Sequence, residues 1–305
     1  MKLSTSSVKA FQKTITSYYR THKRNFPWRE TKDPYAILVS EIMLQQTQAD
    51  RVIPFFTAFL EKFPTPYALA KAPVRDVLKA WQGLGYNRRA LALKNAAEII
   101  VSKHRGIFPR SIAAIDALPG VGPYTAGAIA AFAFGVASPI IETNIRTVYL
   151  HSFFKGKWKV RDAEILEVIQ ITTPLLPPPR LPSTTKTVTG RGADSAPLLG
   201  QVGKRIGSRQ QIREWYHALM DYGAMLKKTV GNPNVRARAY LRQSKFKGSK
   251  RELRGAILRR ATENDVVAFS DFRAQEFAFP IKEIFLQLTA EGFLERKGRV
   301  FVLAK

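Results

Sequence analysis

Apolar side chains recur at three- and four-residue intervals through residues 8–170, which is the spacing of amphipathic α-helices. Proline and glycine interrupt this pattern, for example at Pro64, Gly83 and Gly106. The helices predicted between the interruptions cover residues 8–21, 34–48, 51–63, 67–71, 74–82, 88–104, 111–117, 123–134 and 144–154. Few windows alternate strictly between polar and apolar, so the pattern predicts an all-α fold here.

Residues 173–208 have a different character, with three consecutive prolines, a Gly/Ser/Arg stretch and no aromatic residue. Such a composition cannot bury enough apolar surface to order a chain, so we expect an extended or disordered insertion. Helical periodicity resumes at Arg209.

The last 57 residues, 249–305, change pattern again. Helices are predicted over 250–260 and 281–291, and Phe293 to Leu303 follow as a hairpin that turns at Lys297-Gly298. Helices that end in a β-hairpin are typical of a small winged-helix module. A helical extension with a docked hairpin is the alternative.

The charge balance indicates a polyanionic partner, because the chain has 49 Lys and Arg but only 23 Asp and Glu, which gives a formal net charge of +26. Eight of the basic residues lie within 236–255. No apolar stretch is long enough for a bilayer, and the first residues lack the apolar core of a secretory signal. The chain has no cysteine, which excludes disulfides, thiolate metal sites and Cys-ligated iron–sulfur clusters within it.

A glycine-rich turn, Leu118-Pro-Gly-Val-Gly122, precedes a helix that starts at Pro123 and is rich in small residues. A turn of this kind directs backbone N–H groups of a helix N-terminus at an anion. An ordinary helix–helix turn is the alternative. The motif resembles the helix-hairpin-helix of the DNA glycosylase superfamily that includes endonuclease III and the MutY-type adenine glycosylases. The resemblance implies DNA contacts from the hairpin residues Leu118, Gly120, Val121, Gly122 and Thr125.

Glu41 lies on an otherwise largely apolar helix face, within Val39-Ser-Glu-Ile-Met-Leu-Gln-Gln-Thr-Gln48. Burial disfavours the ionised form, so we expect a raised pKa, as a general acid near neutral pH needs. The local pattern alone favours an exposed or capping glutamate. The segment resembles the catalytic helix of MutY-type glycosylases, which implies that Glu41 protonates the departing adenine.

Glu142 stands at the start of a predicted helix, in Ser138-Pro-Ile-Ile-Glu-Thr-Asn144. The family has Asp at this position, where the carboxylate stabilises positive charge on the sugar, and Asn144 follows two residues later. Glu is one methylene longer and a poorer N-cap, so the rate and the stereochemistry are open. A helix-start charge without a catalytic role is the alternative.

Tyr124 occupies the position where lyase members of the superfamily carry a nucleophilic Lys. Tyrosine forms no Schiff base, so we expect no efficient strand cleavage. MutY enzymes usually have Ser there, whereas thymine-mismatch glycosylases have Tyr. This residue therefore keeps a thymine- or uracil-directed activity open.

Base excision from a duplex requires the nucleotide to be extruded and the gap to be filled. Tyr86 follows a glycine turn in Trp81-Gln-Gly-Leu-Gly-Tyr86 and resembles the family's intercalating residue, and Gln46 resembles its second wedge. A turn staple and a helix cap are the alternatives. Arg88 is a further candidate DNA contact. Trp28 and Arg29 resemble the segment that lines the adenine pocket, although Trp28 is equally compatible with a core position.

The resemblance covers about residues 8–170 and 210–226 and then stops, because the four cysteines of the family's cluster are absent. We therefore expect no cofactor and no 4Fe-4S cluster. The segment 223–238 is expected to be held by packing of Leu226, Pro233 and Val235 against the helix that contains Trp215 and Leu219. The family's Nudix-like domain also has no counterpart in this chain.

The expected architecture is a two-lobed, all-α helix-hairpin-helix glycosylase fold with a small C-terminal α+β, winged-helix-like module. Residues 31–138 form the six-helix lobe, 1–30 and 139–230 the second lobe, 231–248 a basic linker and 249–305 the module. The expected function is a monofunctional glycosylase that excises adenine opposite 8-oxoguanine or guanine. A thymine or uracil mismatch glycosylase and a non-catalytic DNA-binding protein are the alternatives. We also expect double-stranded DNA as the partner, no membrane association, a monomeric state and a cytoplasmic, DNA-associated location.

Overall fold

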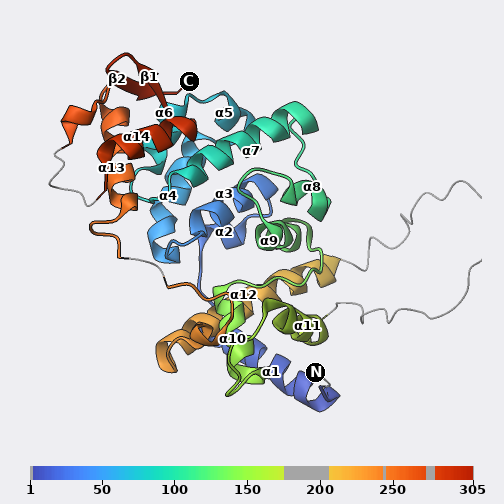
Figure 1. Ribbon diagram of the computed structural model, residues 1–305. Helices are drawn as coiled ribbons and strands as arrows, with labels where there is room; N and C mark the ends of the chain where they lie inside the picture. The colour runs from blue at the N-terminus through green and yellow to red at the C-terminus, as the bar shows by residue number, and fades with distance from the viewer. Residues whose placement is uncertain (1–2, 175–205, 243–244, 273–278, 305) are drawn as a thin grey trace, which may run out of the picture. The chain divides into compact units, whose positions relative to one another are not determined.

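The fold is mostly helical, as predicted, in a computed structural model that describes residues 3–174, 206–242, 245–272 and 279–304 (Figure 1). The elements that carry the argument in chain order are α1 (Thr5–His22), α2 (Pro27–Glu30), α3 (Pro34–Leu44), α4 (Ala49–Lys62), α5 (Pro66–Lys71), α6 (Val74–Trp81), α7 (Arg88–His104), α8 (Ile112–Asp116), α9 (Pro123–Phe134), α10 (Thr143–Phe153), α11 (Asp162–Thr172), α12 (Ile206–Thr229), η1 (Pro233–Arg236), α13 (Lys250–Glu263), η2 (Phe269–Asp271), α14 (Ile281–Ala290), β1 (Leu294–Lys297) and β2 (Val300–Leu303).

The chain divides into two compact units, each made of two separated segments. One unit combines Met1–Asn25 with Gly127–Tyr240, and the other combines Phe26–Ala126 with Leu241–Lys305. The division falls within α9. We call them the 127–240 unit and the 26–126 unit.

The 26–126 unit is built around α3, in which every residue from Tyr35 to Met43 is buried. Asp33 starts this helix, since its carboxylate accepts the N–H groups of Tyr35 and Ala36 at 3.1 and 3.2 Å. The helix ends at Leu44, four residues earlier than predicted. The backbone leaves the helix there, since Gln45 has a ψ of 111° and Gln46 a left-handed φ of 58°.

The C-terminal segment has the predicted order of helices followed by a hairpin. Strands β1 and β2 pair antiparallel, with Leu294 opposite Leu303. Phe301 is fully buried and its ring contacts those of Phe269 and Phe285 at centroid distances of 5.2 and 4.8 Å. Helix α13 packs against α6 (Figure 1), so this module is part of the 26–126 unit.

The 127–240 unit is a bundle in which α12 packs against α10 and α1. Its core is aromatic: Phe11 contacts Tyr149 and Trp215 at centroid distances of 5.5 and 6.0 Å. Asp221 is buried on α12 and accepts the N–H and the Nε of Arg24, at 3.0 and 2.7 Å. These charge-assisted bonds hold the end of the N-terminal segment against α12.

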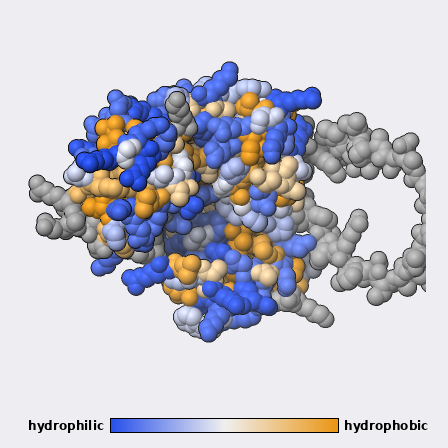
Figure 2. Space-filling model, turned by 45° about the horizontal axis from the view of Figure 1, so that its top comes forward, coloured by the Kyte–Doolittle hydropathy of each residue, from blue (hydrophilic) through white to orange (hydrophobic). Residues whose placement is uncertain are grey.

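Most helix boundaries agree with the sequence pattern to within three residues, because proline and glycine mark them. Helix α11 was not predicted as a separate element. Most of the predicted insertion, 175–205, lies outside the described residues, whereas α12 already begins at Ile206. Over the visible surface, hydrophilic side chains surround separate hydrophobic patches (Figure 2), and no described helix is long and apolar enough to cross a membrane.

Candidate active site

Glu41 and Tyr124 meet in the 26–126 unit although 83 positions separate them. Glu41 lies near the end of α3 with only 5% of its surface exposed. The hydroxyl of Tyr124, in the first turn of α9, donates a hydrogen bond of 3.0 Å to Glu41 Oε2. Two residues that the family resemblance singled out in separate motifs are thus hydrogen-bonded to each other. The predicted direction of the Glu41 pKa stays a prediction.

The hairpin turn between α8 and α9 touches the end of α3. Gln45 Nε2 donates to the carbonyl of Gly120 at 3.2 Å. Gly120 has a φ of 76°, and a Cβ there would lie 2.7 Å from Ala92 Cβ, so glycine is required at this position. Gly122 is different, because its φ is outside the left-handed region and a Cβ would meet nothing within 4 Å. No contact within the described part of the protein therefore requires glycine at 122, and its contact with DNA stays a prediction.

Three further hairpin residues were predicted to contact DNA. Leu118 is 2% exposed and Thr125 is 3% exposed, so both pack inside the unit. Val121 is half-buried, and its N–H donates to the carbonyl of Leu118 at 3.1 Å. Their contact with DNA stays a prediction.

Arg89 joins the end of α3 to the glycine turn before α7, and sequence reasoning missed it. Its guanidinium donates to the carbonyls of Ile42 and Met43 at 3.0 and 2.7 Å, and also to that of Gln45. On the other side it donates to the carbonyls of Leu84 and Gly85, at 3.4 and 3.0 Å. Burial lowers the pKa of Arg89 to about 10. No local signal separates it from Arg88, since the contact depends on tertiary structure.

The two predicted wedge residues occupy the two loops that Arg89 connects. Gln46 is exposed with a φ of 58°, and Tyr86 is half-buried with a φ of 51°. Non-glycine residues rarely adopt this conformation, and such strain is typical of functional sites. Arg88, the next candidate, has a side chain 75% exposed that forms a 3.4 Å ion pair with Glu291.

Trp28 lies in an aromatic cluster of the core. It is 8% exposed, stacks on Phe26 at 4.9 Å between centroids and meets Phe56 edge-on at 5.6 Å. The Arg29 guanidinium lies 5.1 Å from the centre of the Phe26 ring. This burial is what a core position of Trp28 predicts, and the part of Trp28 and Arg29 in an adenine pocket stays a prediction.

Glu142 is the N-cap of α10, in the 127–240 unit. Its Oε1 accepts the backbone N–H groups of Asn144 and Ile145, both at 2.8 Å. The longer side chain therefore makes the capping contacts expected of Asp. Asn144 Nδ2 adds a bond of 3.3 Å to the second carboxylate oxygen.

Lys227 of α12 is the third polar side chain of this group, after Glu142 and Asn144. Its Nζ donates to Asn144 Oδ1 at 2.8 Å. Burial lowers the pKa of Lys227, the charge of Glu142 opposes this shift, and the charge of Arg146 adds to it. At Gly223, one turn earlier on α12, a Cβ would lie 2.1 Å from the Asn144 carbonyl oxygen, so only glycine allows α10 to approach this closely.

The segment after α12 does not fit an iron–sulfur cluster, since the chain has no cysteine to ligate one. It is held by polar contacts with α10 instead. Asn234 Nδ2 donates to Thr147 Oγ1 at 2.7 Å, and Arg236 donates to the carbonyls of Phe154 and Leu150 at 2.6 and 2.9 Å. The expected packing of a 223–238 loop against α12 is wrong in two respects. Leu226 is part of α12 itself, because the helix continues to Thr229, and Val235 is 46% exposed, although Leu226 and Pro233 are buried as expected.

Residues 39–174 match the model of the HhH-GPD superfamily of base excision DNA repair proteins. This segment belongs to the HhH-GPD superfamily. The HhH-GPD segment includes Glu41, the hairpin, Tyr124 and Glu142.

Among curated HhH-GPD relatives, an adenine DNA glycosylase of Mycobacterium tuberculosis (strain ATCC 25618 / H37Rv) is 44% identical over 135 residues, which are 44% of either chain. The adenine DNA glycosylase of Homo sapiens is 40% identical over 152 residues, covering 47% of this chain and 28% of the relative. The chain thus spans less than half the length of these relatives.

Two solved structures share the fold. A thermostable thymine-DNA glycosylase has a TM-score of 0.56 at 27% identity and covers 72% of this chain and 87% of its own. A trapped endonuclease III–DNA covalent intermediate has a TM-score of 0.53 at 16% identity, covering 73% and 88%. The second likeness concerns the fold alone.

Proposed function

We propose that this protein is a monofunctional adenine DNA glycosylase of base excision repair, which hydrolyses the N-glycosidic bond of adenine opposite 8-oxoguanine or guanine and leaves an abasic site. The observation that carries the proposal is the buried Glu41 carboxyl, held by the Tyr124 hydroxyl at 3.0 Å beside the hairpin. The curated relatives are named adenine DNA glycosylases, which supports the same base.

Adenine is a poor leaving group until a ring nitrogen is protonated. Glu41 supplies this proton, since a buried carboxyl favours its neutral form and can act as general acid near neutral pH. The sugar then develops oxocarbenium character, and Glu142 is the carboxylate that stabilises this charge. Water adds at the sugar carbon. No covalent intermediate on Tyr124 is involved, so the phosphodiester strand stays intact.

The direct test uses four duplexes that carry A·8-oxoG, A·G, T·G or U·G, incubated with the protein and then treated with alkali to cleave abasic sites. We expect strand breaks after alkali at adenine only, with 8-oxoguanine or guanine opposite. Breaks without alkali would contradict the monofunctional assignment. A lack of excision from all four duplexes, with binding intact, would instead favour a non-catalytic DNA-binding protein.

A thymine or uracil mismatch glycosylase is the second candidate. Tyr124 supports it, together with the likeness to a thymine-DNA glycosylase at 27% identity. Glu41 favours adenine, because excision of thymine does not need protonation of a ring nitrogen by this acid. Excision from T·G or U·G in the same assay would select the second candidate.

We further propose that the protein acts as a monomer on double-stranded DNA in the cytoplasm and works without a metal cofactor. The absence of cysteine and the polar contacts of Asn234 and Arg236 support cluster-free folding. Chelator treatment should change neither the melting temperature nor the excision rate. Stoichiometric iron or zinc in the purified protein, with activity lost when it is removed, would contradict this.

A further inference from the structure

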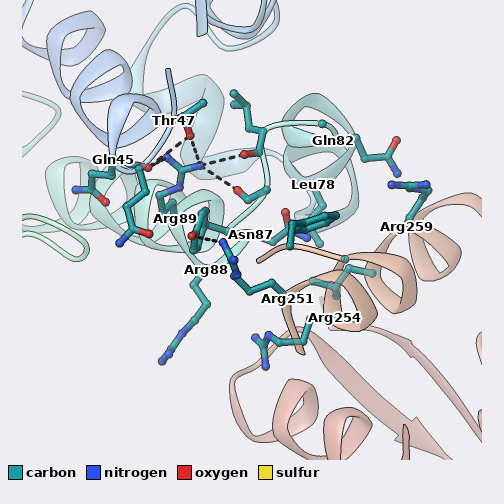
Figure 3. Close-up of a pocket in the computed structure, with 18 of the residues that line it drawn as sticks. Gln45, Thr47, Leu78, Gln82, Asn87, Arg88, Arg89, Arg251, Arg254 and Arg259 are labelled. Carbon is teal, nitrogen blue, oxygen red and sulfur yellow. Dashed lines mark hydrogen bonds between the residues drawn. The ribbon is translucent and has the colours of Figure 1, made fainter. Parts of the chain in front are cut away.

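A pocket of about 790 Å³ lies between the two wedge loops and helix α13, all within the 26–126 unit (Figure 3). Its walls are the loop 45–48 with Gln46, the loop 82–88 with Tyr86, and the face of α13 that carries Arg251, Arg254 and Arg259. The volume is within the 300–1,000 Å³ typical of ligand sites in proteins. The C-terminal module therefore forms one wall of a cavity that also contains both candidate wedge residues.

The pocket is lined by cations and by no described acid. Six arginines line it, namely Arg51, Arg88, Arg89, Arg251, Arg254 and Arg259, and no Asp or Glu is among the lining residues. Glu291, outside the lining, pairs with Arg254 at 3.0 Å and with Arg88 at 3.4 Å, which offsets part of this charge. A net positive field remains, which attracts a phosphate.

These arginines differ in the contacts that they make within the protein. Arg51 and Arg89 donate to backbone carbonyls of the loops. Arg251 donates to the Tyr86 hydroxyl, and its guanidinium lies 5.3 Å from the centre of the Tyr86 ring. Arg259 is exposed and forms no ion pair within the described part of the chain.

Two aromatic rings complete the wall. Two guanidinium groups lie near the Tyr86 ring: that of Arg89 is 5.4 Å from the ring centre and that of Arg251 is 5.3 Å from it. Phe246 lines the same pocket with 59% of its surface exposed, and Arg251 lies 5.9 Å from its ring. Arginines beside exposed aromatic rings are the combination that binds a nucleotide by its phosphate and its base.

We propose that this pocket binds one nucleotide of the DNA strand opposite the excised base. The phosphate contacts Arg259 and the base stacks on the exposed ring of Phe246. The inference rests on the proposed function, since it assumes DNA as the substrate, and it gives the C-terminal module a direct part in binding that substrate. Arg251 acts as a positioning residue for Tyr86.

Arg259 and Arg260 provide a matched pair for the test. Both are exposed arginines and neighbours in the C-terminal half of α13, but only Arg259 lines the pocket. Fluorescence anisotropy with a labelled A·8-oxoG duplex at several salt concentrations should show weaker binding for Arg259→Ala and a salt slope smaller by about 0.9, the value for one phosphate contact. Arg260→Ala should match the wild type. Equal losses in both variants would overturn the proposal.

Chemical changes in the DNA identify the contacts more sharply. A neutral methylphosphonate is placed at each position of the opposite strand in turn. At one position it should weaken DNA binding by the wild type and by Arg260→Ala but leave binding by Arg259→Ala unchanged. An abasic analogue in place of the opposite base should weaken DNA binding by the wild type but not by Phe246→Ala. If all proteins respond alike to both changes, the pocket does not bind this strand.

A free-nucleotide arm distinguishes DNA from a small ligand. Millimolar guanosine or adenosine monophosphate should not displace the duplex, and effective displacement that Arg259→Ala abolishes would make the pocket a small-molecule site instead. All these measurements are of binding. If the wild type binds DNA but excises nothing, the proposed activity fails while the pocket inference is still tested. If it excises adenine but Arg259→Ala and Arg260→Ala bind alike, the pocket inference fails while the proposed activity stands.

Discussion

The two candidate catalytic carboxylates are held in opposite ways. Glu41 lies within the buried helix α3, and its side chain accepts a bond from another side chain, the Tyr124 hydroxyl. Glu142 lies outside the first turn of α10, and its side chain accepts two backbone N–H groups at 2.8 Å. A carboxyl in apolar surroundings is suited to carry a proton, whereas a carboxylate on a helix N-terminus is suited to carry negative charge. The local structures therefore match the different roles proposed for the two acids.

Glu41→Gln tests the proton-donor role of Glu41 and should have the largest effect. The amide keeps the shape but cannot donate the proton, so single-turnover excision should fall by about 10²- to 10⁴-fold, the usual range for general acid catalysis. Duplex affinity should stay within a few-fold. Glu61→Gln, an exposed glutamate on α4, is the control. Excision at the wild-type rate would show that Glu41 is not the acid.

Substitutions of Glu142 test the second carboxylate of the comparison. Glu142→Ala removes both the charge and the cap, so it should lower the free energy of unfolding by about 0.5–2 kcal/mol as well as the excision rate. Glu142→Asp should keep the cap, because Asp is a favoured N-cap residue. Thermal melts and single-turnover rates separate the two effects. If Glu142→Ala is destabilised yet excises at the wild-type rate, the residue is only a cap.

Tyr124→Phe should have a smaller effect. It removes one hydrogen bond to Glu41, worth about 0.5–1.5 kcal/mol, so we expect excision to slow by up to about tenfold with binding unchanged. The pH dependence of the rate should shift, since the hydroxyl acts through Glu41. Tyr67→Phe removes a comparable donor, which bonds the Arg105 carbonyl at 2.9 Å, and serves as the control. A rate loss without any change in the pH profile would indicate a structural role.

Sequence reasoning found the helices more reliably than the ends of the loops that surround the site. Helices α7 and α9 begin and end where the pattern predicts, because Gly, Pro and charged residues mark their ends locally. The early end of α3 was not predictable from the local sequence, since Arg89 binds the carbonyls of Ile42 and Met43 from 47 and 46 positions away.

The candidate site shows the same limit. The family resemblance identified Glu41, Tyr86 and Tyr124, because it rests on short motifs. It could not indicate that Arg251 of the C-terminal module contacts Tyr86, a pair separated by 165 positions. A module outside the resemblance is placed against the motif only by tertiary packing.

The smallest expected effect concerns Lys227, which donates to Asn144 beside Glu142. Burial lowers its pKa below the usual 10.5. Between the lowered value and 10.5 the unfolded chain binds more protons than the folded one, so this residue makes the free energy of unfolding rise with pH in that window. Lys227→Met should remove that contribution, whereas Lys228→Met, at an exposed neighbouring position, should keep it. Urea unfolding at several pH values above neutral measures the difference between the two variants. Parallel pH profiles of the two variants would show that Lys227 contributes no pH dependence to the free energy of unfolding.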